Sequence, residues 1–470
     1  MPLRPNGPPP GVVSVTHQVT ESGDGSGSSS TTSMSIGPPL NGSAATGPNT
    51  QGIIELTLAE ALNLGLRSNL GSLTQGAAVK EAEGERIIAR SALLPSINAA
   101  ISEEFERLNL RTMGVESLSF PTAVKFNYFD ARAAMLNQAV VDLVKVENLH
   151  SATQEFKATL QATRDTRDLV VLAVGGAYLE MSATNARIAA AKAQVDTARA
   201  IADQAEDRLK AGLAPRIDAT RSRVQLQTQE QHLRSLVADL ETQKLRLARI
   251  IGLSLEQRYD LADIYVYSPL AGITEDEASR RASAGRSDLQ AAESQVRAAK
   301  ASLKAARAER LPALSITADF GVAGRTPNNQ STGVYTVYGT LTVPIYEGGR
   351  IRGDIEQADA VLKERQAAYA NLQGQVEQDV RQSFIDLNEA ADQVQVAKSN
   401  VDLAQDTLSQ SRDRFTAGVT DTVEVVQAEQ AVAEANDDYI TAVFEHNLAK
   451  VELAHAMGNA EQFLPEFLRK

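Results

Sequence analysis

Most of this chain has the hydrophobic pattern of long amphipathic helices. Proline is absent from residues 132–208, so the pattern predicts one helix of about 114 Å there. Two shorter helices are predicted for the return path, at 212–252 and at roughly 277–310. Apolar residues also recur every seven positions, a spacing that lets helices pack closely along a seam. They are Leu226, Leu233, Leu240 and Leu247 in one stretch and Ala428, Ala435, Ala442, Ala449 and Ala456 in another.

Four short stretches interrupt the helical pattern with a period of two. They lie at about 96–106, 117–129, 313–323 and 333–346. Apolar side chains alternate there with Ser, Thr, Asn, Lys and Asp, as in a strand with one apolar and one polar face. A tilted strand of about ten residues is long enough to cross a bilayer, and the polar face suits a water-filled lumen.

The four predicted strands cannot close into a barrel by themselves. Two ordinary hairpins packed on the helices would explain the same alternation. In a membrane, however, an open sheet edge is not tolerated, so strands from several copies would have to be combined. Four strands per copy make eight from two copies, with a filled interior, and 12 from three, with room for a channel. The pattern alone does not choose between these arrangements.

An internal two-fold repeat runs through the chain. Residues 57–95 match residues 274–312 without a gap, at an offset of 217. Beyond the strands the offset becomes 206, which places Gly212 on Gly418. The second copy has therefore lost 11 residues, about three helical turns, so that the helix faces stay in register.

These matches and the composition define the expected domains. The first 52 residues are rich in Gly, Ser and Pro, too polar to form a core, and no export signal is visible among them. The expected order is a disordered leader at 1–52, a first repeat at 53–252, a linker at 253–273, a second repeat at 274–463 and a tail at 464–470. The longest apolar run, 169–179, is shorter than a membrane-spanning helix requires.

Charge and cysteine content narrow the chemistry. A formal net charge of -13 argues against a nucleic-acid partner, because such proteins present basic surfaces to the phosphate backbone. The absence of cysteine excludes disulfides, thiolate metal sites and a cysteine nucleophile. Neither property points to an enzyme.

The chain resembles the TolC family of outer-membrane efflux proteins, over about residues 53–463. The resemblance rests on the order and duplication of several stretches, among them "LTLAEALNLGLRSNL", "RLKAGLAPRIDATRSRVQL", "LTVPIYEGGRIRGDIEQA" and "RFTAGVTDTVEVVQAEQAVAEANDDY". It implies a mainly α protein with a membrane β-barrel part. In this architecture a homotrimer forms a 12-stranded barrel in outer-membrane lipid, continued by a coiled-coil helical tunnel across the periplasm. The linker at 253–273 would lie in an equatorial region.

The resemblance also implies partners and a role. The tunnel tips would meet a periplasmic adaptor (membrane fusion) protein, which in turn binds an inner-membrane pump. The channel would be a passive exit duct for efflux or type I secretion, gated at its periplasmic tip, with no catalysed reaction, no cofactor and no resident metal. The transported substrate is not indicated.

Both helical hairpins are expected to reverse at a glycine, because glycine accepts the positive φ of such a turn. The resemblance places an adaptor-docking tip at these turns, formed by Arg208, Gly212, Leu213, Arg414, Gly418 and Val419. It places a channel constriction at the acidic residues six positions after each glycine, Asp218 and Glu424. An alternative role for both carboxylates is to supply negative charge near a helix start.

The tips depart from the family pattern at four positions. Phe415 and Thr420 replace the Tyr and Arg that lock the tip in the best-known relative, so the same closing network is not expected. Gln427 and Arg221 stand where relatives often carry a further acid. How the tip is held closed is thus left open.

Two other classes of protein share parts of this pattern. A soluble coiled-coil rod or scaffold explains the heptad seams but not the strands. A di-metal enzyme is indicated by two Glu-x-x-His patterns, Glu147 with His150 and Glu452 with His455. Counted along straight helices, the two histidines would lie about 93 and 56 Å from the tips, too far apart to share a metal.

Overall fold

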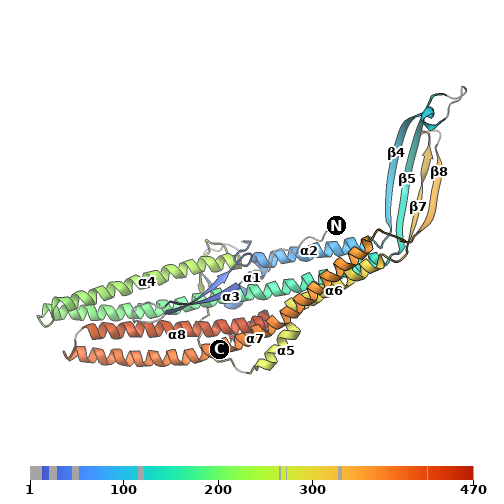
Figure 1. Ribbon diagram of the computed structural model, residues 1–470. Helices are drawn as coiled ribbons and strands as arrows, with labels where there is room; N and C mark the ends of the chain where they lie inside the picture. Colours follow the sequence, from blue (N-terminus) through green and yellow to red (C-terminus); the bar gives the residue numbers. More distant parts are fainter. Residues whose placement is uncertain are drawn as a thin grey trace. The chain divides into compact units, whose positions relative to one another are not determined.

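Two hairpins of long helices make up much of the protein (Figure 1). In the first, α3 (Leu143–Lys210) is followed by α4 (Arg216–Ile251), and in the second, α7 (Arg350–Thr416) is followed by α8 (Thr422–Ala456). The structure is a computed structural model that describes residues 13–20, 29–44, 52–114, 121–263, 266–270, 272–326, 331–420 and 422–468.

The chain divides into two units. Unit 1 is formed by the chain up to Ala78, by Gln161–Gln290 and by the chain from Asn371 onward. Unit 2 comprises Val79–Leu160 and Ala291–Ala370. Unit 1 contains both helical turns, and unit 2 contains the strands that the sequence predicts.

The heptad seams lie where the hairpins pack. All five alanines of the α8 heptad are buried, and so are Leu240 and Leu247 of α4. Small side chains at the seam let the helix backbones approach one another. Arg187 of α3 also donates to Asp437 of α8, with Nε and Oδ1 2.7 Å apart. The Arg187–Asp437 ion pair therefore joins the two hairpins of unit 1, and the alanine face of α8 is buried within this unit.

Five shorter helices complete the helical part. They are α1 (Leu58–Ser68), α2 (Leu70–Ser91), α5 (Glu275–Gly285), α6 (Ser287–Ala308) and α9 (Ala460–Phe467). Thr57 and Thr274 cap α1 and α5, each hydroxyl accepting a hydrogen bond from the amide three residues later. The segment expected as one helix at 277–310 is broken at Arg286. This residue has extended backbone angles, and its guanidinium is held by Asp288 and Asp379.

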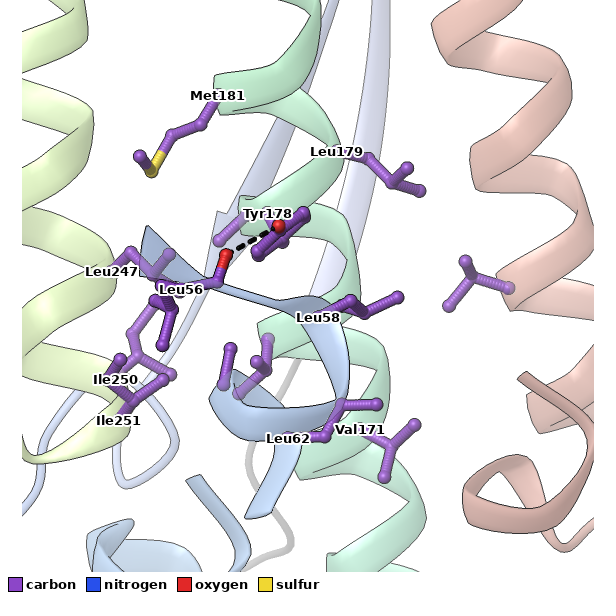
Figure 2. Close-up of a cluster of buried hydrophobic side chains, with 14 of the residues drawn as sticks. Leu56, Leu58, Leu62, Val171, Tyr178, Leu179, Met181, Leu247, Ile250 and Ile251 are labelled. Carbon is purple, nitrogen blue, oxygen red and sulfur yellow. Dashed lines mark hydrogen bonds between the residues drawn. The ribbon is translucent and has the colours of Figure 1, made fainter. Parts of the chain in front are cut away.

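The core of unit 1 surrounds the middle of α3 (Figure 2). Tyr178 is fully buried and its hydroxyl donates to the Leu56 carbonyl oxygen at 2.8 Å. Leu56 ends β3 (Ile54–Leu56), which pairs in parallel with β6 (Tyr259–Leu261) of the linker. Leucine and isoleucine side chains of α1 and α4 close around this bond. The bond fixes the linker strand pair to α3.

One stretch of α3 is apolar enough for a membrane helix. By length and composition alone, an 18-residue window of α3 could cross a membrane, because its mean hydropathy is 1.2. The structure buries 72% of that window inside the protein. Packing in the core of unit 1 accounts for its composition.

Unit 2 contains a four-stranded antiparallel sheet. Its strands are β4 (Ser96–Asn109), β5 (Ala123–Val141), β7 (Ala313–Gly324) and β8 (Ser331–Thr342), in the order β4-β5-β7-β8. A short 3-10 helix, Leu110–Met113, follows β4. Large apolar side chains on this sheet are exposed, among them Ile101, Phe105, Tyr335 and Leu341. The sheet thus presents apolar side chains outward and has β4 and β8 at its edges.

The second strand differs from its expected position. It was predicted at about 117–129, with helix from residue 132, but β5 runs from Ala123 to Val141. Residues 115–120 lie outside the described residues. Ala, Met, Leu and Gln within 133–138 favour helix locally, yet Met135 and Leu136 pair with β4 on one side and β7 on the other. Pairing on both sides overrides the local preference, and α3 begins only at Leu143.

Parts of the expected leader and tail are folded in the structure. Within 1–52, β1 (Val13–Thr20) pairs with β2 (Ser29–Ile36), and the Leu40 side chain is fully buried in the core. The Asn69 side-chain amide donates to the Leu40 carbonyl oxygen at 2.7 Å. At the other end, α9 crosses the expected boundary at 463, and Leu464 is buried in the same core. The described parts of both segments therefore each contribute a large apolar side chain to the core of unit 1.

We expect Leu40→Ala to lower the free energy of unfolding by about 2–5 kcal/mol, since it removes a buried side chain from a packed site. Thermal unfolding of the purified protein, followed by circular dichroism, measures the effect. Leu403→Ala, at an exposed position of α7, is the matched control. If both variants unfold at the wild-type temperature, the segment around Leu40 does not belong to the core.

Candidate docking tips and channel constriction

The two hairpins turn through the same backbone motif. The Gly212 amide donates to the carbonyl three residues earlier at 3.0 Å, and the Leu213 amide to the carbonyl five residues earlier at 2.8 Å. Gly418 and Val419 make the same two bonds at 3.0 and 2.9 Å. These paired bonds form a Schellman motif, which satisfies the last carbonyls of a helix.

Glycine is favoured at both turns by the backbone conformation and not by a lack of space for a side chain. Gly212 has φ +72° and Gly418 has φ +73°, in the left-handed region that other residues rarely adopt. A Cβ atom at either position would meet nothing within 4 Å. A larger residue would therefore strain the backbone without a clash.

Each turn exposes one apolar side chain. Leu213 is 80% exposed and Val419 is 70% exposed. Both follow the glycine directly, at the position that the Schellman motif places outside the helix. The tips thus carry the side chains available for contact with another protein.

Arg208 joins the two tips. Its Nη1 donates to the Phe415 carbonyl oxygen at 2.9 Å, and its Nη2 donates to the Thr416 carbonyl oxygen at 3.2 Å. Its guanidinium carbon lies 4.3 Å from the centre of the Phe415 ring. Phe415 is buried against Ile201 and Val425. A cation at the C-terminal end of α7 also interacts favourably with the helix dipole, so Arg208 caps a helix of the other hairpin.

Glu424 is held within its own tip. Arg414 Nη1 donates to Glu424 Oε1 at 2.9 Å, and the Thr420 hydroxyl donates to Oε2. The Ser411 hydroxyl lies 3.4 Å from Oε1. The Glu424 side chain is 33% exposed, so part of its charge faces solvent. Arg414, expected as a docking residue, therefore serves this carboxylate in the structure.

Asp218 lies between the hairpins. Its Oδ1 accepts a hydrogen bond from the Thr422 hydroxyl at 3.1 Å, and Arg221 Nη1 lies 3.8 Å from the same oxygen. The Asp218 side chain is only 15% exposed, and Thr422 is fully buried. Asp218 therefore binds the second hairpin at the start of α8, while also placing a negative charge in the first turn of α4.

The sequence did not reveal the contacts between the tips. Arg208 and Arg414 are equivalent by the 206-residue offset, but they bind different groups, as do Asp218 and Glu424. The one difference that the sequence does show is that the aspartate side chain is one carbon shorter than the glutamate side chain and therefore reaches less far. Thr422 and the backbone carbonyls of Phe415 and Thr416 carry no sequence signal for this role.

The Glu-x-x-His patterns form no metal cluster. Across the described residues, no group of three or more His, Asp or Glu side chains is placed to hold a metal ion. His150 Nδ1 lies 3.4 Å from Glu147 Oε2 on the surface of unit 2. In unit 1, burial and the nearby Arg286 lower the pKa of His455 to about 4, so it is neutral near pH 7. Burial, with Asp386 adding repulsion, raises the pKa of Glu452 to about 7.

Known proteins similar to this chain are outer-membrane channels. A family model described as outer membrane efflux protein matches twice, at residues 72–253 and 278–459. The pyoverdine export outer membrane protein OpmQ of Pseudomonas putida is 24% identical over 414 residues, covering 84% of each chain. Outer membrane protein TolC of Escherichia coli is 23% identical over 429 residues, covering 87% of this chain and 86% of that protein.

The fold is shared with solved structures as well. The crystal structure of the CmeC outer membrane channel of Campylobacter jejuni matches with a TM-score of 0.75 at 16% identity. The match covers 91% of this chain and 94% of that one. At this identity the likeness establishes the fold, and the tip side chains have to be interpreted from their own contacts.

We expect Arg208→Gln to loosen the contact between the tips. Two hydrogen bonds from a charged donor at a partly exposed site contribute about 1.4 kcal/mol together, which corresponds to roughly tenfold faster amide exchange at the end of α7 and the start of α8. Hydrogen exchange with mass spectrometry measures this. Arg216→Gln, an exposed arginine at the start of α4, is the control. Equal protection in both variants would show that Arg208 does not hold the tips together.

Proposed function

Because this chain belongs to the outer membrane efflux protein family, we propose that it is the outer-membrane channel of a tripartite efflux or type I secretion system. It acts as a passive exit duct across the periplasm and the outer membrane. As in the rest of this family of transport channels, no reaction is catalysed and no cofactor is needed. The substrate is selected by other components of the system.

The observation that carries this proposal is the sheet of unit 2. Its strands are long enough to cross a bilayer, and they expose large apolar side chains. Among the described residues, its edge strands β4 and β8 have one neighbour each. In a soluble rod or scaffold, the apolar side chains of this sheet would be exposed to water, which is unfavourable.

Assembly follows from the open edges. Three copies would place 12 strands in one barrel in outer-membrane lipid and remove every edge. The same three copies would bring their helical hairpins around one axis as a coiled-coil tunnel. The two-fold repeat gives each copy two equivalent hairpins for the wall of that tunnel.

The tips are the proposed contact with a periplasmic adaptor protein, and through it with an inner-membrane pump. The exposed Leu213 and Val419 provide an apolar side chain at each turn, and Gly212 and Gly418 fix the turn that presents them. Arg208 and Arg414 lie behind the turns and bind groups of the chain itself. They support the docking surface and do not form its outermost part.

Asp218 and Glu424 are the proposed channel constriction. Around a three-fold axis their carboxylates would concentrate negative charge, which favours cations over anions. Glu424 is the more exposed of the two and would carry more of this effect. The bonds from Thr422 to Asp218 and from Arg208 to the second hairpin would have to break for the tips to separate.

We expect the purified protein in detergent to have the mass of three chains, because the strand edges need partners. Size-exclusion chromatography with light scattering measures this mass after correction for detergent. A monodisperse monomer that stays soluble without detergent would contradict the channel and favour a soluble rod.

We expect Glu424→Gln combined with Asp218→Asn to lower the cation-to-anion permeability ratio by roughly twofold or more, because fixed negative charge leaves the constriction while Arg414 and Arg221 stay. Reversal potentials in planar bilayers under a salt gradient measure the ratio. Glu389→Gln, at an exposed site of α7, is the control. An unchanged ratio in the double variant would mean that the two carboxylates serve only packing and the helix starts.

A further inference from the structure

A further carboxylate in the helical hairpins is not part of the proposed constriction. Glu429 lies in α8 and is only 7% exposed. Its Oε1 atom has no hydrogen-bond partner among the described residues. The nearest cation, Arg412 of α7, has its Nη2 3.8 Å away, beyond hydrogen-bonding distance. Arg412 Nε is also buried without an acceptor among the described residues, so this ion pair leaves one donor and one acceptor unpaired. A buried carboxylate oxygen without a donor is costly, and a donor from outside the chain would satisfy it.

Glu429 lines a pocket between the hairpins. The pocket has a volume of about 250 Å³ and is formed by all four long helices of unit 1. Leu408, Val432 and two alanines form its apolar part. Its polar part consists of Gln194, Thr197, Gln229, Gln405, Asn436 and Glu429. Glu429 is the only charged side chain among the described residues that line it.

The side chains that line the pocket indicate which class of ligand it would bind. A single carboxylate repels anions, and it is a poor site for a divalent cation, which favours several charged or strongly polar oxygen ligands. An ammonium group needs one strong acceptor and tolerates amide oxygens as further partners. The apolar side chains suit a short alkyl chain. These properties together fit a primary alkylammonium ion.

We propose that this pocket binds a small organic cation of the alkylammonium class, with Glu429 Oε1 accepting a hydrogen bond from the ammonium group. A ligand in this position touches α3 and α4 of one hairpin and α7 and α8 of the other. It therefore stabilises the packed arrangement of the hairpins.

The protonation of Glu429 adds a pH dependence. Burial raises the pKa of Glu429 to about 7, against the opposing effect of Arg412. Arg412 is the only charged group whose contact with Glu429 the described residues show, and the facing side chains of α3 and α4 are neutral. The ionised carboxylate binds the cation, so affinity falls as the pH falls through about 7.

The test uses the full-length protein in detergent and n-butylammonium as the probe. Ligand-observed saturation-transfer NMR measures Kd, with n-butanol as the uncharged analogue. The probe stays charged because an alkylammonium pKa is near that of lysine, about 10.4. We expect binding at pH 8 that is roughly tenfold weaker at pH 6, as the ionised fraction of Glu429 falls. We expect no comparable binding of n-butanol.

Two variants separate the carboxylate from the fold. Glu429→Gln keeps the size of the side chain and should weaken binding at least tenfold, whereas Asp402→Asn, exposed on α7, should leave it unchanged. Ala190→Met, which fills the pocket but keeps the carboxylate, should also weaken binding and serves if Glu429→Gln fails to fold. Equal binding by Glu429→Gln, equal binding of n-butanol, or no binding of n-butylammonium by the wild type at pH 8 would each overturn the proposal.

Discussion

Backbone hydrogen bonding at the edges of one sheet is the constraint on which the rest of this structure depends. In the part of the chain that the structure describes, β4 and β8 each pair on one side only. In hydrocarbon, every unpaired N–H or C=O group costs several kcal/mol, on the order of the penalty for burying an amide without a partner. The exposed apolar side chains of the same sheet, such as Tyr335, are unfavourable in water. In the proposed assembly, further copies of the chain in lipid would remove both costs.

The helical part would meet a different requirement in the proposed channel, because its tips would have to be held together and yet be able to separate. The contact between the tips consists of a few polar bonds, from Arg208 to two carbonyls and from Thr422 to Asp218. Neutral hydrogen bonds contribute about 0.5–1.5 kcal/mol each, and those of a charged donor somewhat more. A contact of this size holds a closed arrangement and can still be broken by the binding energy of another protein. Farther from the tips, the buried alanine seam of α8 is much more extensive.

The periodicity of apolar residues predicted the long helices and the four strands. The elements that it missed are determined by tertiary contacts. The heptads located the buried face of α8, and the period of two located four strands. The extension of β5 to Val141 was missed because its residues prefer helix until β4 and β7 pair with them. The order of the chain near Leu40 was missed because one leucine in a Gly- and Ser-rich segment gives no periodic signal.

At the tips, too, the sequence predicted some residues but not the contacts that they make. Glycine at 212 and 418 could be predicted because a positive φ is a property of the backbone alone. The partners of Arg208 could not, because backbone carbonyls accept hydrogen bonds from any donor that the packing of two hairpins brings within reach. The duplication made the two tips equivalent in backbone while their side chains diverged. In one tip the acid binds its own arginine, and in the other the arginine and the acid both bind the neighbouring hairpin. The contacts that hold the two hairpins together at the tips therefore come from the arginine and the acid of the first hairpin, whereas the equivalent pair in the second hairpin bind each other.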